Sequence, residues 1–192
     1  MPRLGTVLLV LMIAACASAP ASLIPMGSVS PGLRGSVAPP PPIEEQLAQL
    51  KARMFALVVE ERGRLIASVR PLTLDAELEA AAQAHSDDMA KKRSFDAMNP
   101  DGNVAVNALL ADPKFAGFVG ENAAAQYFTP STGFDPDKMA RGFLDIWLAS
   151  PSHRTNLMDP KFERTGIGVA ANGDALYAAE IFAADIGRTA GP

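Results

Sequence analysis

The sequence predicts an α/β protein, a three-layer α/β/α sandwich with a small, mainly antiparallel sheet. Two observations support this fold class. Apolar residues recur at helical spacing in three segments, and two strand-like segments near the end of the chain flank Asn172-Gly173, a pair that suits a tight hairpin turn. The chain has only one cysteine, so no intramolecular disulfide can form and the apolar core has to stabilise the fold.

The first 42 residues are expected to lie outside the globular part. Residues 1–15 carry one arginine and then an apolar run too short to span a bilayer, which indicates a signal peptide. Small residues before Cys16 resemble the bacterial lipobox, which implies that Cys16 is acylated, with palmitate among its chains; an ordinary secretory signal is the alternative. Residues 16–42 then form the lipidated Cys and a flexible Pro/Ser/Gly linker, and residues 43–192 form one domain.

The domain is predicted to begin with three helices of decreasing length. The first runs from about residue 43 to about residue 62, where apolar residues recur at spacings of four and three. They are Ile43, Leu47, Leu50, Met54 and Leu57. Asp75 is a good N-cap for the second helix, which is expected to end near Lys92. The apolar segment 104–110 predicts a brief third helix.

A strand, a helix and a hairpin complete the prediction. Small and aromatic residues over 122–128 are typical of a buried strand. Asp135, followed by a proline, is an N-cap that starts a helix reaching Ala149, and the proline at position 151 is expected to end that helix. Residues 166–170 and 175–183 are the two hairpin strands.

Charge and motif content exclude several classes of function. The formal net charge is −4 and no basic cluster is present, which argues against a nucleic-acid partner. No Gly-x-Ser-x-Gly segment is present, so a serine hydrolase of that type is not expected. Asp87 and Asp88 occupy adjacent helical positions and therefore point in different directions, which indicates a solvated face rather than a paired-carboxylate site.

Four sequence blocks in a fixed order resemble one protein family. They are residues 57–62, Ala81 to Ala90, Gly120 to Ala124 (Gly-Glu-Asn-Ala-Ala) and Trp147 to Met158, which contains Ser-Pro-Ser-His-Arg. Together they resemble the bacterial branch of the CAP superfamily, the cysteine-rich secretory, antigen 5 and pathogenesis-related proteins, also called SCP-like domains. The resemblance implies the sandwich fold predicted above.

The resemblance also implies a cleft. Many members hold a divalent metal there with two histidines and one or two glutamates. Glu121 and His153 match two of these positions, whereas Ala97 and Ser150 stand where the other histidine and glutamate would be. Since a catalytic zinc needs about three protein ligands, the sequence predicts no resident cofactor and at most weak binding of a divalent metal such as zinc at Glu121 and His153.

Further residues are candidates for the lining of this cleft. They are Glu180, Asn122 and Ser150, and Glu180 could add a carboxylate to a weak metal site. Glu121 and His153 could equally form a charge-assisted pair. His85 lies on the apolar stripe of the second helix, so it is expected to be a hydrogen-bonded structural histidine rather than a ligand.

Three functional hypotheses follow. The first is a membrane-tethered, non-catalytic module that binds a small apolar, lipid-like or cell-envelope ligand in the cleft near Glu121 and His153. The second is a metal-dependent, peptidase-like hydrolase that uses the same two residues. The third is a scaffold with a vestigial cleft. The expected location is the bacterial cell envelope, anchored to lipid through Cys16, and outer membrane facing the periplasm because Ala17 is not an aspartate.

Overall fold

The structure of the protein is a computed structural model that describes residues 39–94, 104–111, 115 and 117–185. The predicted signal peptide, Cys16 and nearly all of the linker lie outside these residues, as does Ala97. Within the described part of the chain, no helix is both long and apolar enough to cross a membrane.

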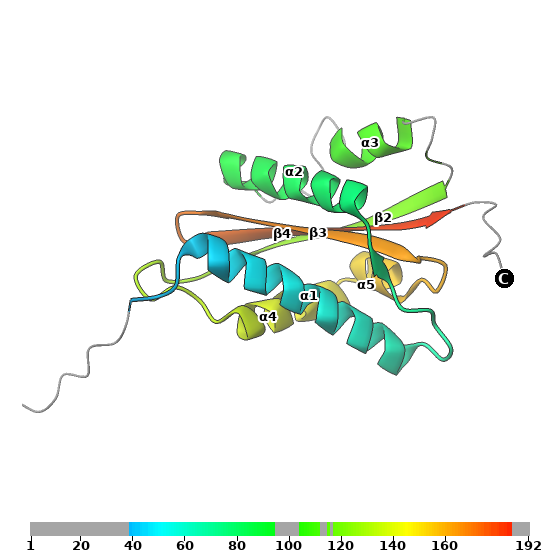
Figure 1. Cartoon of the computed structure of the whole chain (residues 1–192), viewed down its shortest axis with the longest axis horizontal. Helices are drawn as coiled ribbons and strands as arrows, with labels where there is room; N and C mark the ends of the chain where they lie inside the picture. The colour runs from blue at the N-terminus through cyan, green and yellow to red at the C-terminus, as the bar shows by residue number, and fades with distance from the viewer. Residues whose placement is uncertain (1–38, 95–103, 112–114, 116, 186–192) are drawn as a thin grey trace, which may run out of the picture. The chain divides into compact units, whose positions relative to one another are not determined.

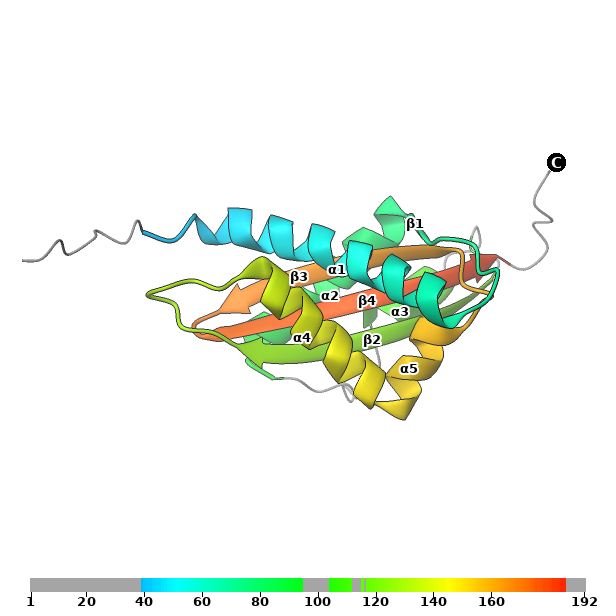
Figure 2. The same ribbon diagram turned by 90° about the horizontal axis from the view of Figure 1, so that it is seen from below.

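The described elements form three layers, with one sheet between two layers of helices (Figure 1). In chain order they are α1 (Ile43–Leu65), β1 (Thr73–Leu74), α2 (Ala76–Lys92), α3 (Val104–Ala111), β2 (Gly117–Tyr127), α4 (Pro136–Ala149), α5 (Pro151–Met158), β3 (Arg164–Asn172) and β4 (Ala175–Asp185). The strand order is β1-β3-β4-β2, with β1 parallel to β3 and the other pairs antiparallel. Helices α2 and α3 cover one face, and α1, α4 and α5 cover the other (Figures 1 and 2). The predicted α/β/α sandwich is confirmed.

Local sequence signals start the helices as predicted. Asp75 accepts hydrogen bonds from the first backbone N–H groups of α2, and Asp135 does the same for α4. The prediction for Pro151 was incomplete, because α4 ends at Ala149 but Pro151 then begins α5. A proline fits that position because the first turn of a helix has no internal acceptor for its N–H groups.

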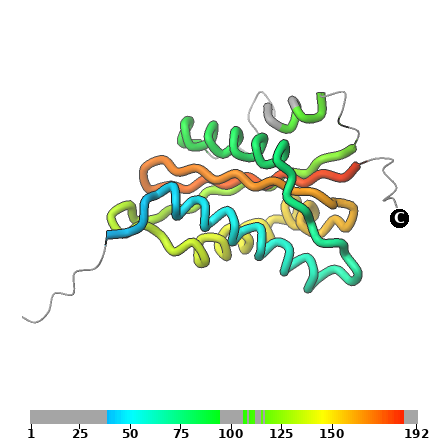
Figure 3. Tube along the Cα trace, viewed as in Figure 1, coloured from blue at the N-terminus to red at the C-terminus, as the bar shows by residue number. Residues whose placement is uncertain are grey.

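Several boundaries differ from the sequence prediction, and both hairpin strands are longer than predicted, at Arg164–Asn172 and Ala175–Asp185. Helix α1 continues past Gly63 to Leu65, since a glycine weakens a helix without ending it, and the N–H of Ile66 then closes the helix on the carbonyl of Arg62. Strand β2 begins at Gly117 because its partner β4 extends to Asp185, with which Gly117 is paired. The predicted turn is present at Gly173, whose φ of 66° favours glycine, and Figure 3 shows the hairpin that it closes.

The apolar core is divided by the sheet into two parts. Between the sheet and α1, α4 and α5 the buried side chains are large, and they include Trp147, Phe143 and Phe182. Between the sheet and α2 they are smaller, with Ala82, Ala179 and Ala183 among them. The small side chains let α2 lie close to the sheet, which brings the polar residues of α2 within reach of the strands.

Candidate functional site

A carboxylate on the sheet and an imidazole on a helix form the centre of the candidate site. Glu121 lies in β2 and points toward α2, where its Oε1 is 2.6 Å from Nδ1 of His85. Both side chains are mostly buried, with 11% of His85 and 18% of Glu121 exposed. Such a short contact between a carboxylate and an imidazole is a strong, orienting hydrogen bond.

His153 supplies a second imidazole near the same carboxylate. It lies in α5 and is partly buried, and this burial lowers the pKa of His153 below its ordinary value, while the charge of Glu121 acts in the opposite direction. The net shift is downward, which favours the neutral form of His153. The carboxylate of Glu121 is thus hydrogen-bonded to one imidazole, that of His85, and acts on a second, that of His153, through its charge.

Asn122 performs a different task from the one its sequence position suggested. It follows Glu121 in β2, so its side chain points to the opposite face of the sheet, where it is fully buried. Its amide Nδ2 donates to the backbone oxygen of His153 at 3.1 Å, and its Oδ1 accepts from Nδ2 of Asn156 at 3.0 Å. Asn122 thus holds α5 rather than lining the space beside Glu121.

Glu180 does not line the cleft either. It pairs with Asn122 across β2 and β4, which puts it on the face away from the Glu121 carboxylate. It is completely buried, its Oε1 accepts from the hydroxyl of Thr165 at 3.0 Å, and burial raises the pKa of Glu180 to about 8. Two carboxylates on opposite faces of a sheet cannot bind one metal ion together, so a site that combines Glu180 with Glu121 is ruled out.

Ser150 lies between α4 and α5. Its hydroxyl is 3.2 Å from that of Ser152, and it makes no hydrogen bond that caps α5 within the described residues. Among those residues, no group of three His, Cys, Asp or Glu side chains is arranged to hold a metal ion. Of the two histidines, His85 uses its Nδ1 for the hydrogen bond with the Glu121 carboxylate, so that nitrogen is not available as a metal ligand.

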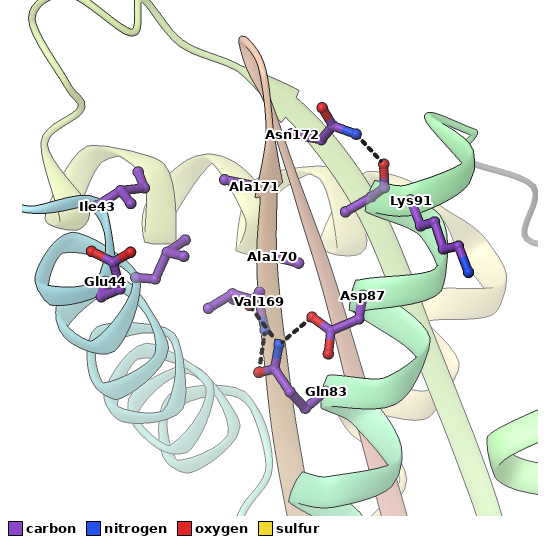
Figure 4. Close-up of a pocket in the computed structure, with 11 residues that line it drawn as sticks. Ile43, Glu44, Gln83, Asp87, Lys91, Val169, Ala170, Ala171 and Asn172 are labelled. Atoms are coloured by element: carbon purple, nitrogen blue, oxygen red, sulfur yellow. Dashed lines mark hydrogen bonds between the residues drawn. The ribbon is translucent and has the colours of Figure 1, made fainter.

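A separate groove lies beside β3, toward the edge of the sheet opposite to β2. Its volume is about 480 Å³, and it is lined by the first turns of α1, by the second half of α2 and by the end of β3. Gln83 bridges part of it, because its side-chain amide bonds both the N–H and the C=O of Val169 (Figure 4). Strand β4 separates β3 from β2, so this groove and the Glu121 site are distinct places.

Sequence reasoning missed the role of His85. As expected it is hydrogen-bonded, but its partner is the glutamate that the family resemblance assigns to the cleft. The available signal was the stripe that His85 shares with Leu78, Ala82 and Met89, since a stripe that packs on a sheet directs its polar member at the strands.

Comparisons with known proteins agree with this architecture. Residues 62–185, more than half of the chain, match the family model "CAP: Cysteine-rich secretory protein family". The chain is 28% identical over 105 residues to the uncharacterized protein YkwD of Bacillus subtilis, an alignment that covers 55% of this chain and only 37% of YkwD.

Two solved structures are also similar. An extracellular protein containing a SCP domain from Bacillus anthracis is 25% identical, with a TM-score of 0.56, over 72% of this chain and 41% of that one. An outer surface protein from Borrelia burgdorferi is 17% identical, with a TM-score of 0.53, over 76% of this chain and 96% of that one. At this identity, the similarity to the Borrelia burgdorferi protein shows a shared fold.

Proposed function

Because the chain belongs to the CAP, or cysteine-rich secretory protein, family, we propose that it is a membrane-tethered, extracytoplasmic binding module. Its ligand site is the group formed by Glu121, His85 and His153. The similarity to an extracellular SCP-domain protein supports export, and the lipobox-like sequence before Cys16 supports a lipid anchor in the bacterial envelope. The proposed orientation is on the outer membrane, facing the periplasm.

One observation supports a preformed binding site most directly, namely the short hydrogen bond between His85 and Glu121. This contact fixes the Glu121 carboxylate, while 18% of that side chain stays exposed. A group that is fixed before the ligand arrives loses less entropy on binding. A fixed and partly exposed carboxylate beside a neutral His153 is suited to hydrogen bonding a polar ligand group.

The site favours a ligand that carries hydrogen-bond donors. The carboxylate of Glu121 accepts from an amine, amide or hydroxyl, and a neutral imidazole both donates and accepts. Lipid headgroups with an ammonium and the amide-rich and hydroxyl-rich polymers of the envelope have these groups. We therefore propose an envelope component, a polar-headed lipid or a peptidoglycan fragment, as the ligand class.

Removal of the carboxylate charge is expected to abolish most of the binding. The probes are a short-chain, water-soluble phosphatidylethanolamine, followed by calorimetry, and purified peptidoglycan, followed by co-sedimentation. For the probe that binds, Glu121→Gln is expected to weaken affinity about ten- to hundred-fold, as for the loss of a hydrogen bond to a charged group.

The control is Ala171→Phe, which narrows the groove beside β3 and leaves the Glu121 site unchanged. Affinity lost in Ala171→Phe but retained in Glu121→Gln would assign the ligand to the groove and contradict the proposal. So would the failure of both probes to bind the native protein.

The alternative function is a metal-dependent hydrolase, which two imidazoles near one carboxylate would suit. We expect zinc to leave the thermal midpoint of the protein unchanged. A ligand that binds only the folded state at 100 times its Kd would add about 2.7 kcal/mol of stability, an increase that thermal unfolding detects easily. A rise in the midpoint with zinc that disappears in His153→Ala would favour the hydrolase.

The anchor can be tested on the mature N-terminus. Mass spectrometry of the exported protein is expected to find Cys16 as the first residue, with a diacylglyceryl group on sulfur and a further acyl chain on nitrogen. Cleavage at another position, or an unmodified Cys16, would contradict the lipoprotein assignment and leave an ordinary secretory signal.

A further inference from the structure

Helix α5, which carries His153, has few means of holding its own position. It has eight residues, and only Leu157 among them is buried. Within the described residues no side chain caps its start, its first turn has no acidic residue and its last turn has no basic one. Isolated helices of this length are unstable in water, so contacts from other elements have to fix α5.

The end of α5 is held by a cation from α1. Arg62 is buried, with 1% of its surface exposed, and its guanidinium donates to the carbonyl oxygens of Leu157 at 2.5 Å, Asp159 at 3.0 Å and Phe162 at 3.2 Å. These carbonyls belong to the last turn of the helix and to the segment after it. The last carbonyls of a helix have no partner within the helix and carry partial negative charge, which the arginine satisfies.

The middle of α5 is held by two asparagines that connect the two halves of the proposed site. Asn156 donates from Nδ2 to the backbone oxygen of Glu121 at 2.8 Å and to Oδ1 of Asn122 at 3.0 Å. Asn122 then donates to the backbone oxygen of His153 at 3.1 Å. An unbroken chain of hydrogen bonds therefore runs from the backbone of Glu121 to the backbone of His153.

The space for this chain is closely fitted. A Cβ atom at Gly120 would lie 2.9 Å from Oδ1 of Asn156 and 2.8 Å from the ring of Phe162, both closer than real Cβ contacts. Because Gly120 has no side chain, there is room for the amide group of Asn156. Asn122 is completely buried, so its hydrogen bonds are protected from competition with water.

We propose that Arg62, Asn122 and Asn156 are positioning residues that fix His153 relative to Glu121 before a ligand arrives. This inference rests on the proposed function, because it treats Glu121 and His153 as parts of one site. A site that is fixed in advance loses less entropy when it binds, so these three residues contribute to affinity without touching the ligand.

The test uses the two imidazoles as reporters in the ligand-free protein. The chain contains only His85 and His153, so two-dimensional NMR gives two sets of imidazole signals, and His153→Gln identifies them. Asn156→Ala is expected to move the His153 signals by more than their line width. The His85 signals are expected to move less, because His85 lies in α2, outside the hydrogen-bond chain that holds α5.

Two further variants keep the test decisive. Arg62→Lys keeps the cation but cannot reach three carbonyls, so it is expected to move the same signals if Asn156→Ala does not fold. Asn172→Ala is the matched control, because it removes an amide that donates to the carbonyl of Ala90 at 2.7 Å, far from the site. It is expected to lower stability and to leave both imidazoles in place.

Lower stability in Asn156→Ala or Arg62→Lys with unmoved His153 signals would overturn the proposal, and so would equal movement in Asn172→Ala. Because no ligand takes part, the NMR result is independent of the binding probes. Failure of both probes to bind would remove the proposed function and leave the positioning result intact, and the reverse also holds.

Discussion

Replacement of Gly168 by alanine is expected to lower the free energy of unfolding by about 3 kcal/mol or more, since overpacking of a fitted core costs about 1–3 kcal/mol even where side chains can adjust. Gly168 lies in β3 beneath α2. A Cβ atom there would lie 2.2 Å from the carbonyl carbon of Ala82 and 2.3 Å from the nitrogen of Gln83. These are backbone atoms, so the only relief is movement of the whole helix.

The same movement would disturb the candidate site. Helix α2 carries His85, whose Nδ1 contacts Glu121. Gly168 lets α2 lie close to this face of the sheet. A displacement of α2 by the added methyl group therefore lengthens that hydrogen bond as well. Urea unfolding gives the loss of stability, and the imidazole signals of His85 report the displacement.

Gly63→Ala is the matched control for Gly168→Ala. Gly63 lies in α1, where a Cβ atom would have no neighbour within 4 Å, so the alanine is expected to add about 0.5 kcal/mol through its better helix propensity. If Gly168→Ala were as stable as the native protein, α2 would not be in direct contact with β3, and the packing that brings His85 to Glu121 would be wrong.

The elements that the sequence predicted well are those whose signals are local. Asp75 and Asp135 cap helices that begin one residue later, and Gly173 lies in the tight turn that follows Asn172, the last residue of β3. Each of these depends on neighbours in the chain, so spacing and residue type are sufficient. The order of four short blocks was also sufficient to identify the family, because proteins that share such a pattern share a tertiary structure.

Features that depend on distant contacts were missed. Helix α5 has one buried residue, so its sequence has almost no helical stripe, and Arg62, which satisfies its last carbonyls, is 95 residues from Leu157. The contact between His85 and Glu121 joins residues 36 apart and requires α2 to lie on the sheet. Glu180 was expected in the cleft from its position in the family pattern, whereas the face of the sheet on which it lies depends on strand register.

Replacement of Glu180 by glutamine is expected to stabilise the protein at pH 8, with a gain that shrinks toward pH 5. The cause is burial, which raises the pKa of Glu180 from 4.5 to about 8. Below pH 4.5 the carboxyl group is protonated in both the folded and the unfolded chain. Between pH 4.5 and 8 only the unfolded chain releases the proton freely, so the free energy of unfolding falls by about 1.4 kcal/mol per pH unit.

Above pH 8 both states are ionised and the loss stops. Over the whole interval it amounts to a few kcal/mol, in order of magnitude, because the carboxylate would be desolvated with only the hydroxyl of Thr165 and the nearby charge of Arg62 to oppose its burial. A glutamine at this position keeps an oxygen for Thr165 and does not titrate, so its stability is expected to be independent of this ionisation.

Urea unfolding of both proteins at pH 5, 6, 7 and 8 measures the difference directly. Glu60→Gln, which removes one negative charge from the exposed side of α1, is the matched control for net charge. If the difference between Glu180→Gln and the native protein stayed constant over this range, Glu180 would already be ionised in the folded state. It would then form a buried ion pair with Arg62. The arginine that donates to the carbonyls at the end of α5 would in that case be positioned by a carboxylate and not by a neutral acid.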